Sequence, residues 1–371
     1  MQSIHPPRAT VRTGTDRKVN LKSLGESELC DFVEAIGEPR FRGRQLFSWL
    51  YGKGVSDFGE MTNLPAALRS RLPEVAEAPR IEFVREQVAT DATIKALTRL
   101  PSGRHVETVL IPDFDETGAA NRLTVCVSSQ VGCAMGCGFC ATGRMGFHQN
   151  LVAGEIYDQV WLMNELAQER FGRRVTNVVF MGMGEPLLNY DQVLRATELL
   201  MHPGALGLSP RRITVSTVGL ARRIRQLADD GTRFKLAISL HAPSDEKRSS
   251  IMPVNRSEST DLTALRDAVQ HYARTTGQRV TYEYCMFDGF NDSETDARRL
   301  AAVARWAPSK VNLIMYNPVP GLEFQPTPED RLNRFIRVLV NEGVTVTVRR
   351  SRGQDIAAAC GQLAGEAEGG R

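Results

Sequence analysis

The sequence predicts an α/β fold built on parallel strands. Seven short apolar runs rich in β-branched residues support this, at 123–127, 175–181, 213–217, 234–240, 280–286, 311–315 and 344–348. Most gaps between them carry apolar residues at helical spacing, as in 156–166, 262–272, 297–306 and 331–340. Alternating strands and helices indicate a parallel sheet, either a closed or partial barrel or an open doubly wound sheet.

The residues before 121 follow other patterns and divide into three parts. Residues 1–20 are basic and almost free of large apolar residues, which predicts a flexible leader. Residues 21–80 have apolar positions at helical spacing and predict a small helical accessory domain. Residues 81–120 predict a β-rich connector, with a turn at Pro101, Ser102 and Gly103. The core is then expected over 121–350 and a C-terminal segment over 351–371.

Composition fits a globular protein and leaves the ligand open. The 371 residues are 42% hydrophobic and 24% charged, and the net charge is +3. That charge is too small to imply a nucleic-acid partner without local basic clusters. The sequence has neither a signal-peptide core nor an apolar run of about 20 residues, so we expect a cytoplasmic protein without a membrane partner.

Cysteine usage points to metal or thiol chemistry. Seven cysteines without a secretion signal argue against a framework of structural disulfides. Cys133, Cys137 and Cys140 have the spacing C-x-x-x-C-x-x-C directly after the first predicted core strand. Thiolates are ligands for iron-sulfur clusters and for zinc. One alternative is therefore a structural zinc site with Cys126 as the fourth ligand. Three thiols on one short loop favour a cubane cluster that leaves one iron free.

Together with a second motif, this loop resembles the radical SAM superfamily. Gly182 to Pro186 (Gly-Met-Gly-Glu-Pro) follows the second predicted strand and is similar to the Gly-Glu-Pro motif of that superfamily. The resemblance implies a partial (β/α)6 radical SAM barrel and one 4Fe-4S cluster held by the three loop cysteines. It also implies that S-adenosylmethionine is bound at the open iron, near Gly184 and Glu185.

Polar residues near the carboxyl ends of later strands extend this expected cofactor site. Strand alternation places Thr214 with Ser216 on one face, and Ser239 with His241 on another, while Asn317 follows the sixth strand. Parallel barrels carry their chemistry at this end. We therefore predict that S-adenosylmethionine is bound by Gly184, Glu185, Ser216, Ser239, Leu240, His241 and Asn317.

Longer shared strings narrow the resemblance to the RlmN/Cfr family of radical SAM RNA adenine methyltransferases. They include 106–112, 127–132, 182–189, 238–243 and 355–365, the last with Ala-Ala-Cys-Gly-Gln-Leu-Ala-Gly at 358–365. The implied activity is methylation of carbon 2 of an adenosine in 23S rRNA and in tRNA. The nearest alternative is methylation of carbon 8 by the same machinery. A further alternative is an RNA-binding protein with a zinc knot and no catalysis.

The family resemblance also implies residue roles. Cys360 would carry a methyl group as S-methylcysteine, Cys126 would be the resolving thiol that forms a transient disulfide with Cys360, and Glu107 would be the proton acceptor. Two S-adenosylmethionine molecules would be used per turnover, and an electron-donor protein such as flavodoxin or ferredoxin would be needed. RNA contact is expected at the basic clusters 40–44, 211–212 and 349–352.

Overall fold

The computed structural model describes residues 18–257 and 260–365; most of the predicted leader lies outside these ranges. The amino-terminal domain contains α1 (Glu26–Ala35), α2 (Phe41–Phe47) and α3 (Ala66–Val75), with a π-helical turn at Ser48–Gly52 and 3-10 turns at Leu21–Ser23 and Phe58–Glu60. β1 (Val19–Asn20) pairs with β2 (Ala76–Glu77) in parallel. β1 therefore lies within the last residues of the predicted leader, before the predicted boundary at residue 21.

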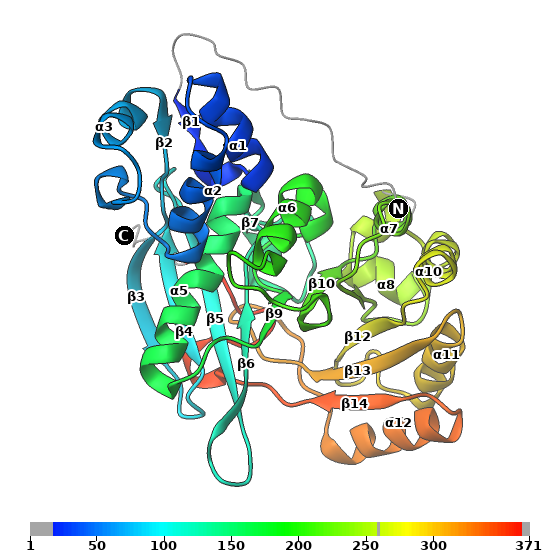
Figure 1. The fold of residues 1–371 in the computed structure, drawn as a ribbon. Coiled ribbons are helices and arrows are strands. Elements are labelled where there is room, and N and C mark those ends of the chain that lie inside the picture. The colour runs from blue at the N-terminus through cyan, green and yellow to red at the C-terminus, as the bar shows by residue number, and fades with distance from the viewer. Residues whose placement is uncertain (1–17, 258–259, 366–371) are drawn as a thin grey trace.

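This helical domain packs on the long helix α5 (Ala153–Phe171) of the core (Figure 1). The buried Lys22 ammonium lies 2.5 Å from the Asp158 carboxylate of α5. Tyr157 of the same helix donates a hydrogen bond from its hydroxyl to the Tyr51 carbonyl. A buried charge is tolerated when it is paired, so these contacts fix where the domain docks.

A single ten-stranded sheet runs through the connector and the core, in the order β14-β13-β12-β11-β10-β9-β6-β5-β4-β3. The antiparallel part is the predicted connector, and seven parallel strands follow it. The strands are β3 (Glu82–Val88), β4 (Ile94–Arg99), β5 (His105–Phe114), β6 (Ala120–Cys126), β9 (Asn177–Phe180), β10 (Ile213–Thr217), β11 (Lys235–Ser239), β12 (Val280–Met286), β13 (Ser309–Met315) and β14 (Val346–Arg349).

Helices cover the outer side of the curved parallel sheet (Figure 1). Apart from α5, they are α6 (Tyr190–Met201), α7 (Ala221–Asp229), α8 (Asp245–Ile251), α9 (Val254–Ser257), α10 (Leu262–Thr276), α11 (Glu294–Ala304) and α12 (Glu329–Asn341), with 3-10 turns at Pro186–Asn189, Pro210–Arg212 and Gln354–Ile356. Each main helix buries one apolar stripe, as Leu332, Phe335 and Leu339 do on α12.

The predicted fold class is confirmed as a partial, open barrel. Within the described ranges, the edge strands β14 and β3 do not pair with each other, so the parallel sheet curves without closing. Among the same residues, no helix is both long and apolar enough to cross a membrane.

Candidate active site

The three-cysteine loop is held at its base by a small hairpin. β7 (Gln130–Gly132) pairs antiparallel with β8 (Phe147–Asn150), and the short helix α4 (Ala141–Arg144) lies between them. Cys133 donates its backbone N-H to the Gly146 carbonyl. Gly132 has φ +71°, and a side chain there would collide with the same carbonyl, so this crossing requires glycine.

The three thiols lie close enough to influence one another electrostatically. Burial raises the pKa of Cys133 to about 12, and the nearby charges of Glu185 and Cys140 act in the same direction. Burial also raises the pKa of Cys137, and the charges of Cys140 and Cys133 raise it further. A buried group of mutually repelling thiolates needs a positive partner, and soft sulfur donors match iron. The donor set therefore fits an iron-sulfur cluster.

A 4Fe-4S cluster and a single metal ion require different arrangements of the ligand side chains. In the described part of the chain, no three His, Cys, Asp or Glu side chains are arranged so that they could hold one metal ion. In a 4Fe-4S cluster, by contrast, the cysteines bind separate iron atoms.

The motif at 182–186 lies directly against this loop. Gly184 has φ +99°, and a Cβ there would be 2.5 Å from the Gln130 Cβ. The Glu185 carboxylate is buried and accepts hydrogen bonds from the backbone N-H groups of Leu187 (3.0 Å) and Val218 (2.9 Å). Burial raises its pKa to about 7, although these hydrogen bonds oppose the shift. Glu185 is thus fixed in orientation beside the cysteine loop.

The predicted polar residues of β10 and β11 are brought together. The Ser216 and Ser239 hydroxyls lie 3.3 Å apart. Leu240 and His241 follow β11, and their backbone N-H groups donate to the Glu283 carbonyl of β12. His241 has φ +55°, and its ring packs edge-on against Phe139 of the cysteine loop with the centroids 4.9 Å apart.

The protonation of His241 is determined by its surroundings. Burial lowers its pKa to about 3, and the positive charge of Arg248 adds to this. Its Nδ1 accepts a hydrogen bond from the Cys285 N-H at 3.0 Å. The imidazole is therefore neutral, with its proton on Nε2 as a donor.

Residues after β14 bring Cys360 to the cysteine loop. The Gly361 carbonyl accepts from the Ala141 N-H at 2.8 Å, and the Leu363 carbonyl accepts from the Thr142 hydroxyl at 2.6 Å. The buried Asn317 donates to the Cys360 carbonyl at 3.4 Å. This C-terminal segment thereby joins a loop that lies 220 residues earlier in the chain.

A cavity of about 610 Å³ opens beside these elements and contains both predicted carrier and resolving thiols. Cys126 from β6 and Cys360 line it together with Asn317 and Arg349. Burial raises the pKa of Cys126 to about 12, the charge of Cys360 adds to this, and the Arg349 guanidinium opposes it. All seven cysteines are free thiols in the structure.

Glu107 on β5 is engaged with the C-terminal segment. Its Oε1 lies 3.0 Å from the Lys95 ammonium, and its Oε2 accepts from the N-H groups of Ala364 (2.9 Å) and Gly365 (3.2 Å). Lys95 also donates to the Ala357 carbonyl at 3.3 Å. The predicted proton acceptor therefore lies next to the Cys360 segment, although it does not line the cavity in this conformation.

Comparisons with known proteins agree with this geometry. Residues 19–78 match the ribosomal RNA large subunit methyltransferase N-terminal domain, and residues 127–301 match the radical SAM superfamily. A probable dual-specificity RNA methyltransferase RlmN of Salinibacter ruber is 64% identical over 99% of this chain and its own full length. The chain belongs to the RlmN family of radical SAM RNA methyltransferases.

Other members of the family support the same assignment. The RlmN methyltransferase of Solidesulfovibrio magneticus is 45% identical over 94% of this chain and 97% of its own length. The crystal structure of a radical SAM methyltransferase from Sphaerobacter thermophilus has a TM-score of 0.86 and 45% identity, and the match covers 94% of this chain and all of that one.

The RlmN family is one of enzymes, and its radical SAM chemistry implies a 4Fe-4S cluster and S-adenosylmethionine. The predicted enzyme class is thus confirmed, and the alternative of a zinc-knot protein without catalysis is wrong. The individual site residues remain predictions. Sequence reasoning missed Lys95. It assigned Arg349 to a basic cluster expected to contact RNA, and the structure places Arg349 half-buried beside the two thiols.

Proposed function

We propose that this enzyme methylates carbon 2 of a specific adenosine in 23S rRNA and in tRNA through a methyl group carried by Cys360. The observation that carries the proposal is the placement of Cys126 and Cys360 in one cavity beside the three-cysteine loop. The names of the relatives, dual-specificity RNA methyltransferases, support two RNA substrates. Both RNAs are cytoplasmic in bacteria, so we expect the protein to act there.

Carbon 2 of adenine lies between two ring nitrogens and is electron-poor, so it reacts poorly with an electrophilic methyl group. Reduced by one electron, the cluster with bound S-adenosylmethionine supplies a radical that can abstract hydrogen. Cys133, Cys137 and Cys140 would hold the cluster, and Gly184, Glu185, Ser216, Ser239, Leu240, His241 and Asn317 would bind S-adenosylmethionine. Two such molecules are used per turnover, one for the methyl and one for the radical, and flavodoxin or ferredoxin supplies the electron.

The chain's own residues would then complete the transfer. After the Cys360 methylene group bonds to carbon 2, Glu107 would accept the carbon 2 proton, and the unpaired electron that the addition leaves on the adduct would return to the cluster. The Cys126 thiolate attacks the Cys360 sulfur, which forms the S-S bond and breaks the bond between sulfur and methylene. The released carbon takes up a proton to become the methyl group, and a thiol reductant later restores both cysteines.

Deletion and restoration of the gene test the proposal. RNA from cells that lack the protein should contain no 2-methyladenosine at its target positions, and re-expression should restore it in both 23S rRNA and tRNA. Mass spectrometry against synthetic 2-methyladenosine and 8-methyladenosine separates the two regiochemistries. Restoration of 8-methyladenosine would contradict the proposal while retaining the family assignment.

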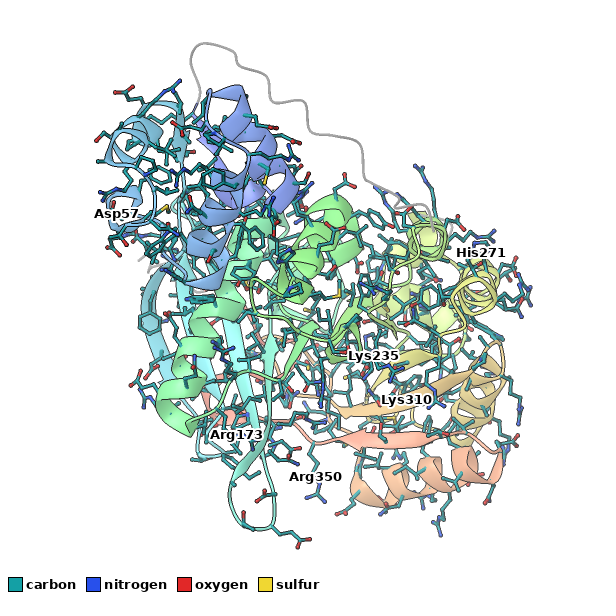
Figure 2. The ribbon with its side chains drawn as sticks, viewed as in Figure 1. Asp57, Arg173, Lys235, His271, Lys310 and Arg350 are labelled. Carbon is teal, nitrogen blue, oxygen red and sulfur yellow. The ribbon has the colours of Figure 1, made fainter. Side chains whose placement is uncertain are left out.

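A basic cluster at the amino ends of the core strands supports an RNA substrate. Lys235 begins β11 and Lys310 lies near the start of β13 (Figure 2). Both line the cavity. Burial lowers the pKa of Lys235, and the charges of Lys310, Arg212, Arg122 and Arg211 lower it further. Mutually repelling cations at the mouth of a cavity suit a polyanion. Arg40, by contrast, is paired with Asp31 and Glu34.

Replacement of both lysines by glutamine (K235Q/K310Q) should weaken RNA binding and its salt dependence. For single-stranded RNA each phosphate contact contributes about −0.7 to the slope of log K against log salt, so the loss of two contacts should make the slope shallower by about 1.4. Fluorescence anisotropy over a KCl series measures this slope. The control R274Q/R337Q removes two exposed cations from the outer helices α10 and α12 and should leave the slope unchanged. Equal slopes in all three proteins would contradict this role.

A further inference from the structure

A row of polar side chains crosses the inner face of the sheet within the same cavity. Glu283 on β12, Asn312 on β13 and Thr347 on β14 are register neighbours, and all three line the cavity. Asn312 donates from Nδ2 to Glu283 Oε1 at 2.9 Å, and its own Oδ1 accepts from the Thr347 hydroxyl. These bonds fix the orientation of the Asn312 amide and hold one oxygen of Glu283.

Among the residues that the structure describes, none donates a hydrogen bond to the second carboxylate oxygen of Glu283. The side chain is only 3% exposed, and its Oε2 is buried without a hydrogen bond in the described part of the structure. A buried acceptor without a partner destabilises the folded protein, so a native site that retains one calls for an explanation. Arg349 does not supply the bond, since its guanidinium donates to the Met181 sulfur at 3.4 Å instead.

The position of Glu283 Oε2 restricts which group can donate a hydrogen bond to it. Thr281 and Glu283 both face the cavity that holds Cys126 and Cys360, and the cavity volume of about 610 Å³ lies within the usual range for ligand pockets. Enzymes that modify a base draw it out of its stack into such a pocket. A carboxylate accepts hydrogen bonds and donates none, so it pairs with an exocyclic amine and repels a carbonyl.

We propose that Glu283 recognises the target base by accepting a hydrogen bond at Oε2 from the exocyclic N6 amine of adenine. This inference rests on the proposed function, which supplies the identity of the base. Burial raises the pKa of Glu283, whereas the positive charges of Arg349 and Lys310 and the Asn312 hydrogen bond oppose that shift and favour the accepting carboxylate.

The same residue links base recognition to the predicted cofactor site. The backbone carbonyl of Glu283 accepts from the N-H of Leu240 at 3.0 Å and from that of His241 at 3.4 Å. Its side chain faces the RNA pocket, while its backbone holds the segment expected to bind S-adenosylmethionine. Glu283 thus positions the base relative to the cofactor, without itself taking part in a bond-making step.

A matched pair of substrates tests this contact. Wild-type enzyme is assayed on an RNA with adenosine at the target position and on the same RNA with purine ribonucleoside, which lacks only the amine. We expect kcat/KM to be about 10- to 100-fold lower for purine, as for a lost hydrogen bond to a charged group. In E283Q, the Asn312 Nδ2 should still donate to the oxygen of the introduced side-chain amide. The NH2 group of that introduced amide then faces the N6 amine of the base, and neither group can accept. The preference for adenosine should then fall to about unity.

Comparison of the adenosine-to-purine ratio of kcat/KM in wild type with the same ratio in E283Q separates base recognition from the intrinsic reactivity of the base. Changes in the intrinsic reactivity of purine affect both enzymes equally and cancel. T281V, two residues earlier on the same face of β12, should retain the wild-type ratio. An unchanged ratio in E283Q would overturn the proposal, as would a wild type that shows no preference.

If E283Q does not fold, assays of the wild-type enzyme on modified RNAs still test the proposed contact. An RNA with inosine, whose O6 would face the carboxylate, should be worse than purine both in kcat/KM and in Kd from fluorescence anisotropy. Inosine or purine equal to adenosine would overturn the proposal. A wild type that methylates no adenosine RNA would instead show that the proposed function has failed.

Discussion

Cys126→Ala should trap RNA covalently on the enzyme, whereas Cys360→Ala should not. Without Cys126 the methyl is stored and the carbon bond to the base forms, but no thiolate attacks the Cys360 sulfur. Without Cys360 no methyl is stored, so RNA remains both free and unmodified. The two thiols line one cavity, and disulfide formation requires Cα atoms roughly 4.4–6.8 Å apart at the moment of reaction.

A denaturing gel with labelled RNA measures this difference. The Cys126→Ala lane should contain a protein-RNA adduct that nuclease removes, and the Cys360→Ala lane should contain free RNA. Cys30→Ala is the matched control, because Cys30 is a buried thiol in the helical domain and should leave turnover intact. RNA trapped by both variants, or by neither, would rule out the two-cysteine mechanism for this protein.

Loss of Cys137 should remove iron, whereas loss of Cys126 should not. Cys137 lies on the loop between β7 and α4, where the charges of the neighbouring thiols Cys140 and Cys133 help to raise its pKa. Cys126 lies on β6 and faces the cavity instead. After anaerobic purification, we expect Cys137→Ala to fall to background iron and to lose the absorbance near 400 nm. Cys126→Ala should keep wild-type iron.

The iron and zinc content of each purified protein tests which cysteines hold the cluster. Cys285→Ala provides a control, since Cys285 is a buried thiol on β12 outside the cysteine loop. Equal iron loss in Cys126→Ala and Cys137→Ala would instead make Cys126 a ligand. Colourless wild-type protein loaded with zinc would contradict the cluster itself.

The core strands could be predicted from sequence because their apolar runs are long and buried. The predicted runs 213–217 and 280–286 coincide with β10 and β12 at both ends. The hairpin β7–β8 was missed because its strands are short and carry polar residues such as Gln130 and Gln149, which give no periodic signal. Glycine contacts such as Gly132 against Gly146 determine it instead.

The candidate site was predictable mainly through motif spacing and family resemblance. The cysteine loop comes after β6 and Glu185 comes after β9, and because these two strands pair in parallel, the fold alone makes them neighbours. The partners of Glu107 could not be foreseen, because backbone N-H groups at 364 and 365 carry no sequence signal. Glu283 did carry one, as a charged residue inside the apolar run 280–286.

The attachment of the C-terminal segment also has a consequence for how the enzyme is made. Its anchors are distant in sequence: Asp91 accepts from the Gly353 N-H, Glu107 from that of Ala364, and Gly361 from that of Ala141. Chains are synthesised from the amino end, and domains fold as they emerge. All ten strands of the main sheet precede residue 350, so the barrel can assemble before Cys360 has been translated. A nascent or prematurely terminated chain therefore possesses the three-cysteine loop without Cys360, the proposed methyl carrier.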